Sequence, residues 1–134
     1  MNLPRLFRIL SFFVFIQIAL GGLVTFGIIS VSVNSFDLVT LIHIINGLIV
    51  LGLALVVTMQ AVQSKPSHKG LNEVSMALLI FVVVQIGIGF TLVGVVDSVY
   101  LAWVHLLMAV LIYAMTLVGR SFAMLRDQAA GLVK

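Results

Sequence analysis

Four long apolar runs, separated by short polar breaks, leave this chain few possible folds. We place them at residues 8–32, 38–62, 73–96 and 98–120. A transmembrane helix needs about 20 mostly apolar residues, so each run is long enough to cross a bilayer. Because 63% of the residues are hydrophobic and only 8% are charged, the composition excludes an ordinary soluble domain. We predict one transmembrane domain over residues 1–134.

The four runs are expected to form α-helices. Helices and closed barrels are the only structures that satisfy every backbone hydrogen bond in lipid, and the runs lack the period-two alternation of barrel strands. Arg5 and Arg8 resemble the start of a signal peptide, but no convincing small-residue cleavage site follows, and the apolar run continues to about Ser32. The sequence therefore predicts an all-α integral membrane protein, a four-helix up-down bundle that retains its first helix.

All the basic residues fall on one side of the predicted bundle. The seven are Arg5, Arg8, Lys65, Lys69, Arg120, Arg126 and Lys134. The links on the opposite side carry only Asp37 and Asp97 as charges. Because cytoplasmic segments are enriched in Lys and Arg, we predict a multi-pass protein of the cell membrane with both termini in the cytoplasm. The net charge of +3 then reflects membrane topology, and no nucleic-acid partner is predicted.

Two helix hairpins, about residues 10–62 and 73–120, share polar landmarks. The segment IQIALGGLV aligns with VQIGIGFTLV, and LIHIINGLIVLGLALV aligns with WVHLLMAVLIYAMTLV. The aligned pairs are Gln17 and Gln85, Gly21 and Gly89, and His43 and His105. Apolar segments align easily by chance, but matching polar residues in the same order favour an internal duplication. We predict a bundle built from a duplicated helix hairpin.

The two aligned histidines are the candidate ligands. His43 and His105 each follow shortly after an outer-link aspartate, which places both roughly one and a half to two helical turns inside the outer surface. In an up-down bundle their helices are parallel, so the imidazoles are expected at one depth, facing each other. Neutral imidazole is a preferred axial ligand of heme iron, and bundles hold such cofactors between facing helices. We predict a heme of b, o or a type with His43 and His105 as axial ligands.

Other roles for this pair stay open at the level of sequence. A histidine in a membrane helix also serves as a hydrogen-bond partner between helices, and two of them can share a proton-relay role. A metal-ion site is less favoured, because no carboxylate or thiol accompanies the pair. We assign Gly21 and Gly89 to clearance for a flat macrocycle, with close helix packing as the alternative. Gln17 and Gln85 are expected to bond to each other or to backbone.

The chain resembles the heme A synthase family of respiratory-oxidase assembly proteins over about residues 10–120. The resemblance consists of Gln-x-x-x-Gly on the odd helices and a histidine near the outer start of each even helix. The matching residues are Gln17, Gly21, His43, Gln85, Gly89 and His105. The resemblance implies a half-length, four-helix member whose His pair binds heme and which oxidises a methyl group of heme O. It also implies a homo-oligomer in which two chains rebuild the eight-helix arrangement.

Two features depart from the family pattern. No glutamate lies among residues 37–42, where family members carry one before the first histidine, and the chain has no cysteine. The outer links also lack a Lys or Arg to face heme propionates, which favours a partner that supplies the charge. Three functions remain: a heme A synthase-like enzyme, a non-catalytic heme-bearing subunit of a respiratory oxidase complex, and a structural membrane subunit whose histidines join two helices.

Three segments near the ends of the spans carry local expectations. Tyr100 and Trp103 are expected to anchor the fourth span at the membrane interface. His68 lies in the polar link SKPSHKG and is expected to be solvated. The last residues, DQAAGLVK, are expected to form a short frayed tail.

Overall fold

Four helices make up most of the computed structural model, which describes residues 2–25, 32–33, 36–65, 67–94 and 98–131. The helices are α1 (Leu3–Thr25), α2 (Leu38–Gln63), α3 (Lys69–Gly94) and α4 (Val99–Ala129). Each is long and apolar enough to cross a membrane, so the prediction of four helical spans is confirmed. A short antiparallel pair, β1 (Ser32–Val33) and β2 (Phe36–Asp37), precedes α2.

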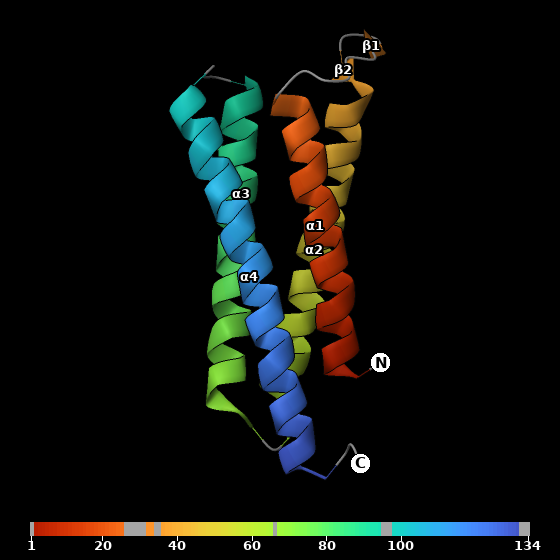
Figure 1. The fold of residues 1–134 in the computed structure, drawn as a ribbon, viewed down its shortest axis with the longest axis vertical. Helices are drawn as coiled ribbons and strands as arrows, with labels where there is room; N and C mark the ends of the chain where they lie inside the picture. The colour runs from red at the N-terminus through yellow and green to blue at the C-terminus, as the bar shows by residue number, and fades with distance from the viewer. Residues whose placement is uncertain (1, 26–31, 34–35, 66, 95–97, 132–134) are drawn as a thin grey trace.

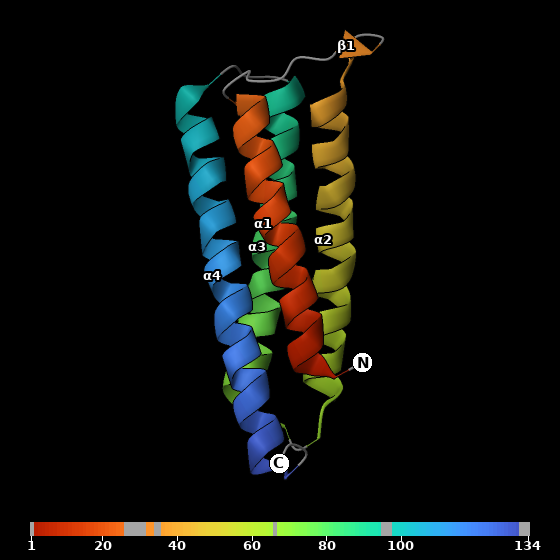
Figure 2. The ribbon, with the colours of Figure 1, turned by 45° about the vertical axis from the view of Figure 1, so that its right-hand side comes forward.

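The helices alternate in direction around a bundle (Figure 1). Both α1 and α3 pack against α2 and α4, so each helix has two neighbours. The described ends of the chain lie together at one end of the bundle, beside the link between α2 and α3 (Figure 2). We call this end, which holds Leu3 and Ala129, the closed end. The other end, where α2 and α4 begin, is the open end.

The closed half of the bundle is densely packed. Large side chains that are almost completely buried include Phe7, Leu10, Val57, Leu71 and Leu78. Phe7 of α1 fills a notch that Gly119 leaves on α4: a Cβ on Gly119 would lie 2.6 Å from Cζ of Phe7. Small residues at such positions allow membrane helices to approach closely. The contact therefore joins the first helix to the last, with no room for a larger residue at position 119.

Hydroxyl groups in the closed half have partners inside the bundle. The Ser11 Oγ of α1 lies 2.8 Å from Thr116 Oγ1 of α4. On the opposite side, Thr58 Oγ1 of α2 donates to the carbonyl oxygen of Ser75 at 2.9 Å. Hydrogen bonds between membrane helices are each worth about 0.6 kcal/mol on average. They add a modest amount of stability, and they fix the register of the helix pairs.

The first helix differs from its predicted bounds at both ends. It begins at Leu3 because the side chain of Asn2 caps it: the Arg5 N–H donates to Asn2 Oδ1 at 3.2 Å. The predicted end at Ser32 is wrong, because Ser32 lies in β1 and pairs with β2. Residues 26–31, which were also predicted to be helical, lie outside the described part of the chain.

The last helix extends well beyond its predicted end at residue 120. The expectation that the frayed tail begins at Asp127 is wrong, because α4 continues to Ala129, and residues 132–134 of the predicted tail lie outside the described part of the chain. Asp127 is only 3% exposed and forms an ion pair with Arg126. The Ala130 N–H closes the helix by donating to the Arg126 carbonyl oxygen at 3.0 Å. Pairing the two charges allows this polar segment to pack instead of fraying.

His68 is part of the closed-end packing, so the expectation that it is solvated is wrong. It caps α3, which begins at Lys69 and not at residue 73, by accepting the Leu71 N–H on Nδ1 at 3.2 Å. Its ring packs against Phe122 of α4, with ring centroids 5.4 Å apart. The second helix begins at Leu38 as predicted. The predicted end of the third helix at residue 96 lies outside the described residues.

Candidate functional site

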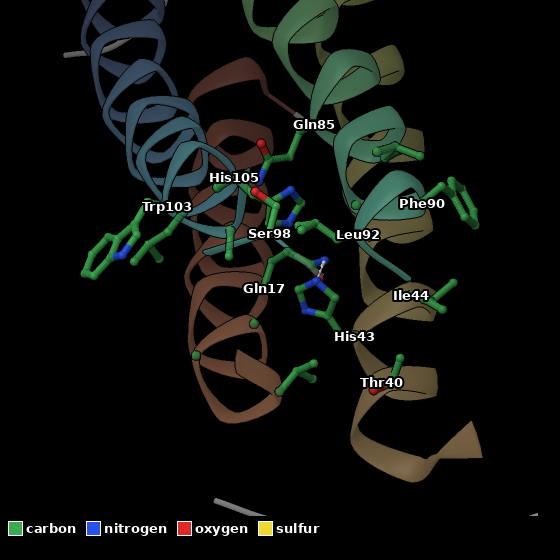
Figure 3. Close-up of a pocket in the computed structure, with 18 of the residues that line it drawn as sticks. Gln17, Thr40, His43, Ile44, Gln85, Phe90, Leu92, Ser98, Trp103 and His105 are labelled. Atoms are coloured by element: carbon green, nitrogen blue, oxygen red, sulfur yellow. Dashed lines mark hydrogen bonds between the residues drawn. The ribbon is translucent and has the colours of Figure 1, made fainter. Parts of the chain in front are cut away.

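A cavity of about 600 Å³ lies between the four helices in the open half of the bundle (Figure 3). Its polar and glycine lining includes Gln17, Gly21, His43, Gln85, Gly89 and His105. Apolar side chains such as Ile44, Leu92 and Trp103 form most of the remaining wall. The volume falls within the range of about 300–1,000 Å³ that is typical of small-molecule sites. All four residues that the sequence predicted to bind a cofactor therefore border one cavity.

The two histidine rings face each other across this space. His43 projects from α2 and His105 from α4, and their ring centroids are 6.4 Å apart, with an angle of 56° between the ring planes. The Nδ1 atoms of both rings are buried and have no hydrogen-bond partner among the described residues. Buried polar atoms are normally paired, so such orphaned atoms call for an explanation. A hydrogen-bonding group beside the rings would provide one.

A glycine on the neighbouring helix lies against each histidine ring. A Cβ on Gly21 of α1 would lie 3.1 Å from Cε1 of His43, and a Cβ on Gly89 of α3 would lie 3.2 Å from Cε1 of His105. Both distances are shorter than an ordinary van der Waals contact, so any side chain at either position would force the adjacent ring to shift. The sequence assigned these glycines to clearance for a macrocycle, and the structure places them where they set the positions of the imidazoles.

A side-chain network supports His43. Gln17 Nε2 of α1 lies 3.1 Å from His43 Nε2. The other end of the Gln17 amide, Oε1, accepts from Asn46 Nδ2 at 2.6 Å, and Asn46 Nδ2 also donates to the carbonyl oxygen of Phe13 at 3.0 Å. The expectation that Gln17 bonds only to backbone or to Gln85 is therefore wrong. Its amide links the main chain of α1, through Asn46, to the histidine ring.

Gln85 is used differently in the second hairpin. Its Nε2 donates to the backbone carbonyl oxygen of His105 at 2.7 Å, which confirms the expected bond to backbone. The side chain is only 9% exposed, yet its Oε1 has no partner in the part of the chain that the structure describes. Gln85 therefore joins α3 to α4 through the main chain of His105. Among the described residues it has no recorded hydrogen bond to the His105 ring.

Asn46 and Gly47 are site residues that the sequence analysis did not assign to the site. Asn46 is almost completely buried, and it follows His43 by one helical turn, so both project from the same face of α2. That spacing was the available signal. Gly47 leaves room for the Gln17 amide, because a Cβ there would lie 3.2 Å from Gln17 Nε2. The predicted repeat does not extend to these two residues, since Met108 and Ala109 align with them.

The cavity wall carries no formal charge at the residues that the structure describes. None of its described lining residues is Asp, Glu, Lys or Arg. The described residues also contain no group of three or more His, Cys, Asp or Glu side chains that could hold a metal ion. A bare ion such as zinc takes three or four protein ligands. A heme brings its own equatorial nitrogens and leaves only the two axial positions for the protein, so a His pair is sufficient.

Comparisons of this chain with protein families, with curated proteins and with solved structures find no match.

Proposed function

We propose that this chain is a heme-binding membrane protein in which His43 and His105 are the axial ligands of the iron. The observation that carries the proposal is the facing imidazole pair, with ring centroids 6.4 Å apart, beside a cavity of about 600 Å³. Both imidazoles border the same cavity, so together they would supply the two protein ligands that a heme requires. The glycines that pack against the two rings support the same site.

Different residues of the chain would hold different parts of the heme site. Gly21 and Gly89 keep the two rings in position from behind, and the apolar walls exclude water from the faces of the macrocycle. When bound, the heme supplies one-electron redox chemistry or serves as the substrate that is modified. The resemblance to heme A synthases supports a role in heme A biosynthesis and respiratory oxidase assembly. The absence of a glutamate before His43 favours the second candidate, a non-catalytic heme-bearing subunit.

The uncharged wall bears on the partners of the chain. Heme propionates are anionic, and no Lys or Arg is among the described residues that border the cavity. Burying an unpaired charge is costly, so the positive charge would come from another polypeptide at the open end. This supports a homo-oligomer or a subunit of a respiratory oxidase complex. A purely structural subunit is the remaining alternative. The Gln17–His43 contact favours this alternative because the contact joins α1 to α2.

The proposed membrane orientation places the closed end in the cytoplasm. The support is the distribution of Lys and Arg. Tyr100 (85% exposed) and Trp103 (56% exposed) beside the open end suit interface anchors, which occur on either side of a membrane. A duplicated hairpin accounts for the matched Gly–His contacts of the two halves. Because the chain has no cysteine, single substitutions Ser67→Cys and Asn34→Cys test the orientation directly. An impermeant maleimide added to intact cells should label the variant at position 34 and spare the one at position 67.

The test of heme binding is an absorption spectrum of the purified protein, oxidised and reduced, with a pyridine hemochrome assay. Wild type should show sharp reduced bands, and the hemochrome should identify the heme as b, o or a type. His43→Ala and His105→Ala should each abolish these bands. His68→Asn is the matched control, because it changes a histidine outside the cavity and keeps a capping side chain at the start of α3. A colourless wild type that takes up no added heme would overturn the proposal.

A further inference from the structure

Hydrogen-bond donors and acceptors determine the orientation of the Gln17 side chain. The carbonyl oxygen of Phe13 can only accept, so the Asn46 atom that lies 3.0 Å from it must be the amide nitrogen Nδ2. The same Nδ2 lies 2.6 Å from the Gln17 amide, whose nearer atom must then be the acceptor Oε1. The other end of the Gln17 amide, the donor Nε2, therefore faces His43.

A donor facing His43 determines which ring nitrogen carries the proton. Gln17 Nε2 lies 3.1 Å from His43 Nε2 and can only donate, so His43 Nε2 must accept. A neutral ring that accepts on Nε2 carries its proton on Nδ1. The Nδ1 atom is buried without a partner among the described residues, so no contact there opposes this assignment. The relay from the Phe13 main chain through Asn46 and Gln17 thus selects one tautomer of His43.

The second hairpin has no equivalent relay to its histidine. Ala109 aligns with Gly47 of the first hairpin. Its methyl group would occupy the space that Gly47 leaves open for the Gln17 amide. Met108 replaces Asn46 and has no N–H to donate. Gln85 bonds instead to the main-chain oxygen of His105. The His105 ring has no recorded side-chain hydrogen bond in the described part of the structure that would fix its tautomer.

We infer that Gln17 is a positioning residue that holds His43 in the Nδ1–H tautomer. Its amide also occupies the Nε2 lone pair of His43, which would have to be free for that nitrogen to bind a heme iron. The inference rests on the proposed heme site. A metal binds the ring nitrogen that lacks a proton, and the partners of the ring set which nitrogen that is. Gln17 therefore selects Nε2 as the ligating atom and also competes for it. His105 has no such competitor among the described residues, so an amide would have to move aside only at His43.

The first test needs no heme. Ring-nitrogen NMR of isotope-labelled histidine in the purified, heme-free protein should report the Nδ1–H tautomer for His43. Gln17→Met, which keeps the length of the side chain and removes the donor, should abolish that preference. Gln85→Met is the matched control, because Gln85 contacts only the backbone of His105. An Nε2–H tautomer of His43 in wild type, or the same tautomer preference in Gln17→Met as in wild type, would overturn the inference.

The second test adds hemin to the same three proteins. Binding to wild type must break the Gln17–His43 hydrogen bond, so Gln17→Met should bind hemin more tightly than wild type, by no more than about threefold, the factor that corresponds to one membrane hydrogen bond. Gln85→Met should bind as wild type does. Weaker binding by Gln17→Met would contradict displacement of the amide. If wild type binds no hemin, the proposed function fails, while the tautomer measurement still decides whether Gln17 orients His43.

Discussion

The two hairpins of the bundle place the same three residue types around the cavity but connect them differently. In α1–α2 the glutamine bonds to the histidine ring, and in α3–α4 it bonds to the histidine main chain. The glycine contacts, in contrast, are nearly the same, with 3.1 Å in one hairpin and 3.2 Å in the other. The comparison shows that backbone geometry is shared between the halves, whereas hydrogen bonding depends on the two residues that follow one turn after each histidine.

The largest expected effect comes from filling the space behind the rings. Gly21→Leu and Gly89→Leu should each weaken heme binding more than tenfold, because the new side chain displaces the ring, and overpacking typically costs about 1–3 kcal/mol. Hemin titration with absorption spectroscopy measures this. Gly52→Leu and Gly87→Leu are matched controls, since a Cβ at either position meets nothing within 4 Å and neither glycine borders the cavity. A larger loss at Gly21 than at Gly89 would break the symmetry that the contacts predict.

Removing the Asn46 amide should have the next largest effect. Asn46→Leu deletes the hydrogen bonds to Phe13 and Gln17 and leaves a buried acceptor unpaired, so we expect a loss of about 1–2 kcal/mol in the free energy of unfolding. Met108→Leu, the equivalent change in the second hairpin, should alter stability by less. Unfolding in mixed micelles measures both. Equal losses in the two hairpins would show that the relay contributes nothing to the difference between them.

A smaller effect is expected at Gly47. Gly47→Ala places a Cβ 3.2 Å from the Gln17 amide nitrogen, so the amide must shift and its bond to His43 should weaken. Helix propensity favours alanine by up to about 1 kcal/mol, so overall stability should change little. The His43 tautomer preference, measured by ring-nitrogen NMR, should decrease. A preference as strong as in wild type would mean that the amide does not need the space above Gly47.

The smallest effect is expected from rebuilding the relay in the second hairpin. Met108→Asn introduces a donor at the position of Asn46, and the orphaned Oε1 of Gln85 becomes its natural acceptor. One membrane hydrogen bond is worth about 0.6 kcal/mol, so a gain of that order is expected in the free energy of unfolding. The same change with Ala109→Gly should give His105 a tautomer preference. A loss of stability would mean that the halves differ in backbone as well as in side chains.

The sequence predicted the four spans because length and composition alone determine them in a bilayer. It also predicted the pairing of His43 with His105, since matched polar residues in a duplicated hairpin lie at one depth. Asn46 escaped notice because hydrophobicity is nearly uniform around each helix and does not indicate which face turns inward. The partners of Gln17 were missed for a related reason. A glutamine amide can reach several donors and acceptors by rotating its side chain, and the sequence does not show which of them it contacts.

The ends of the helices were predicted less well than their middles. The segment from Asp127 onward was predicted to be a frayed tail, but Asp127 and Arg126 neutralise each other and Asp127 is buried. His68 looked like a loop residue, yet its ring nitrogen caps α3 and its face lies on Phe122. In each case a polar group packs against the bundle because a specific neighbour satisfies it, and sequence position alone does not reveal that neighbour.

The notch in which Phe7 meets Gly119 has a consequence for the biogenesis of the protein. The closed half is filled by the chain's own side chains and needs nothing from outside to complete it. The packing of this half does not depend on the cavity. Under the proposed function, insertion into the bilayer and delivery of the heme would therefore be separate events.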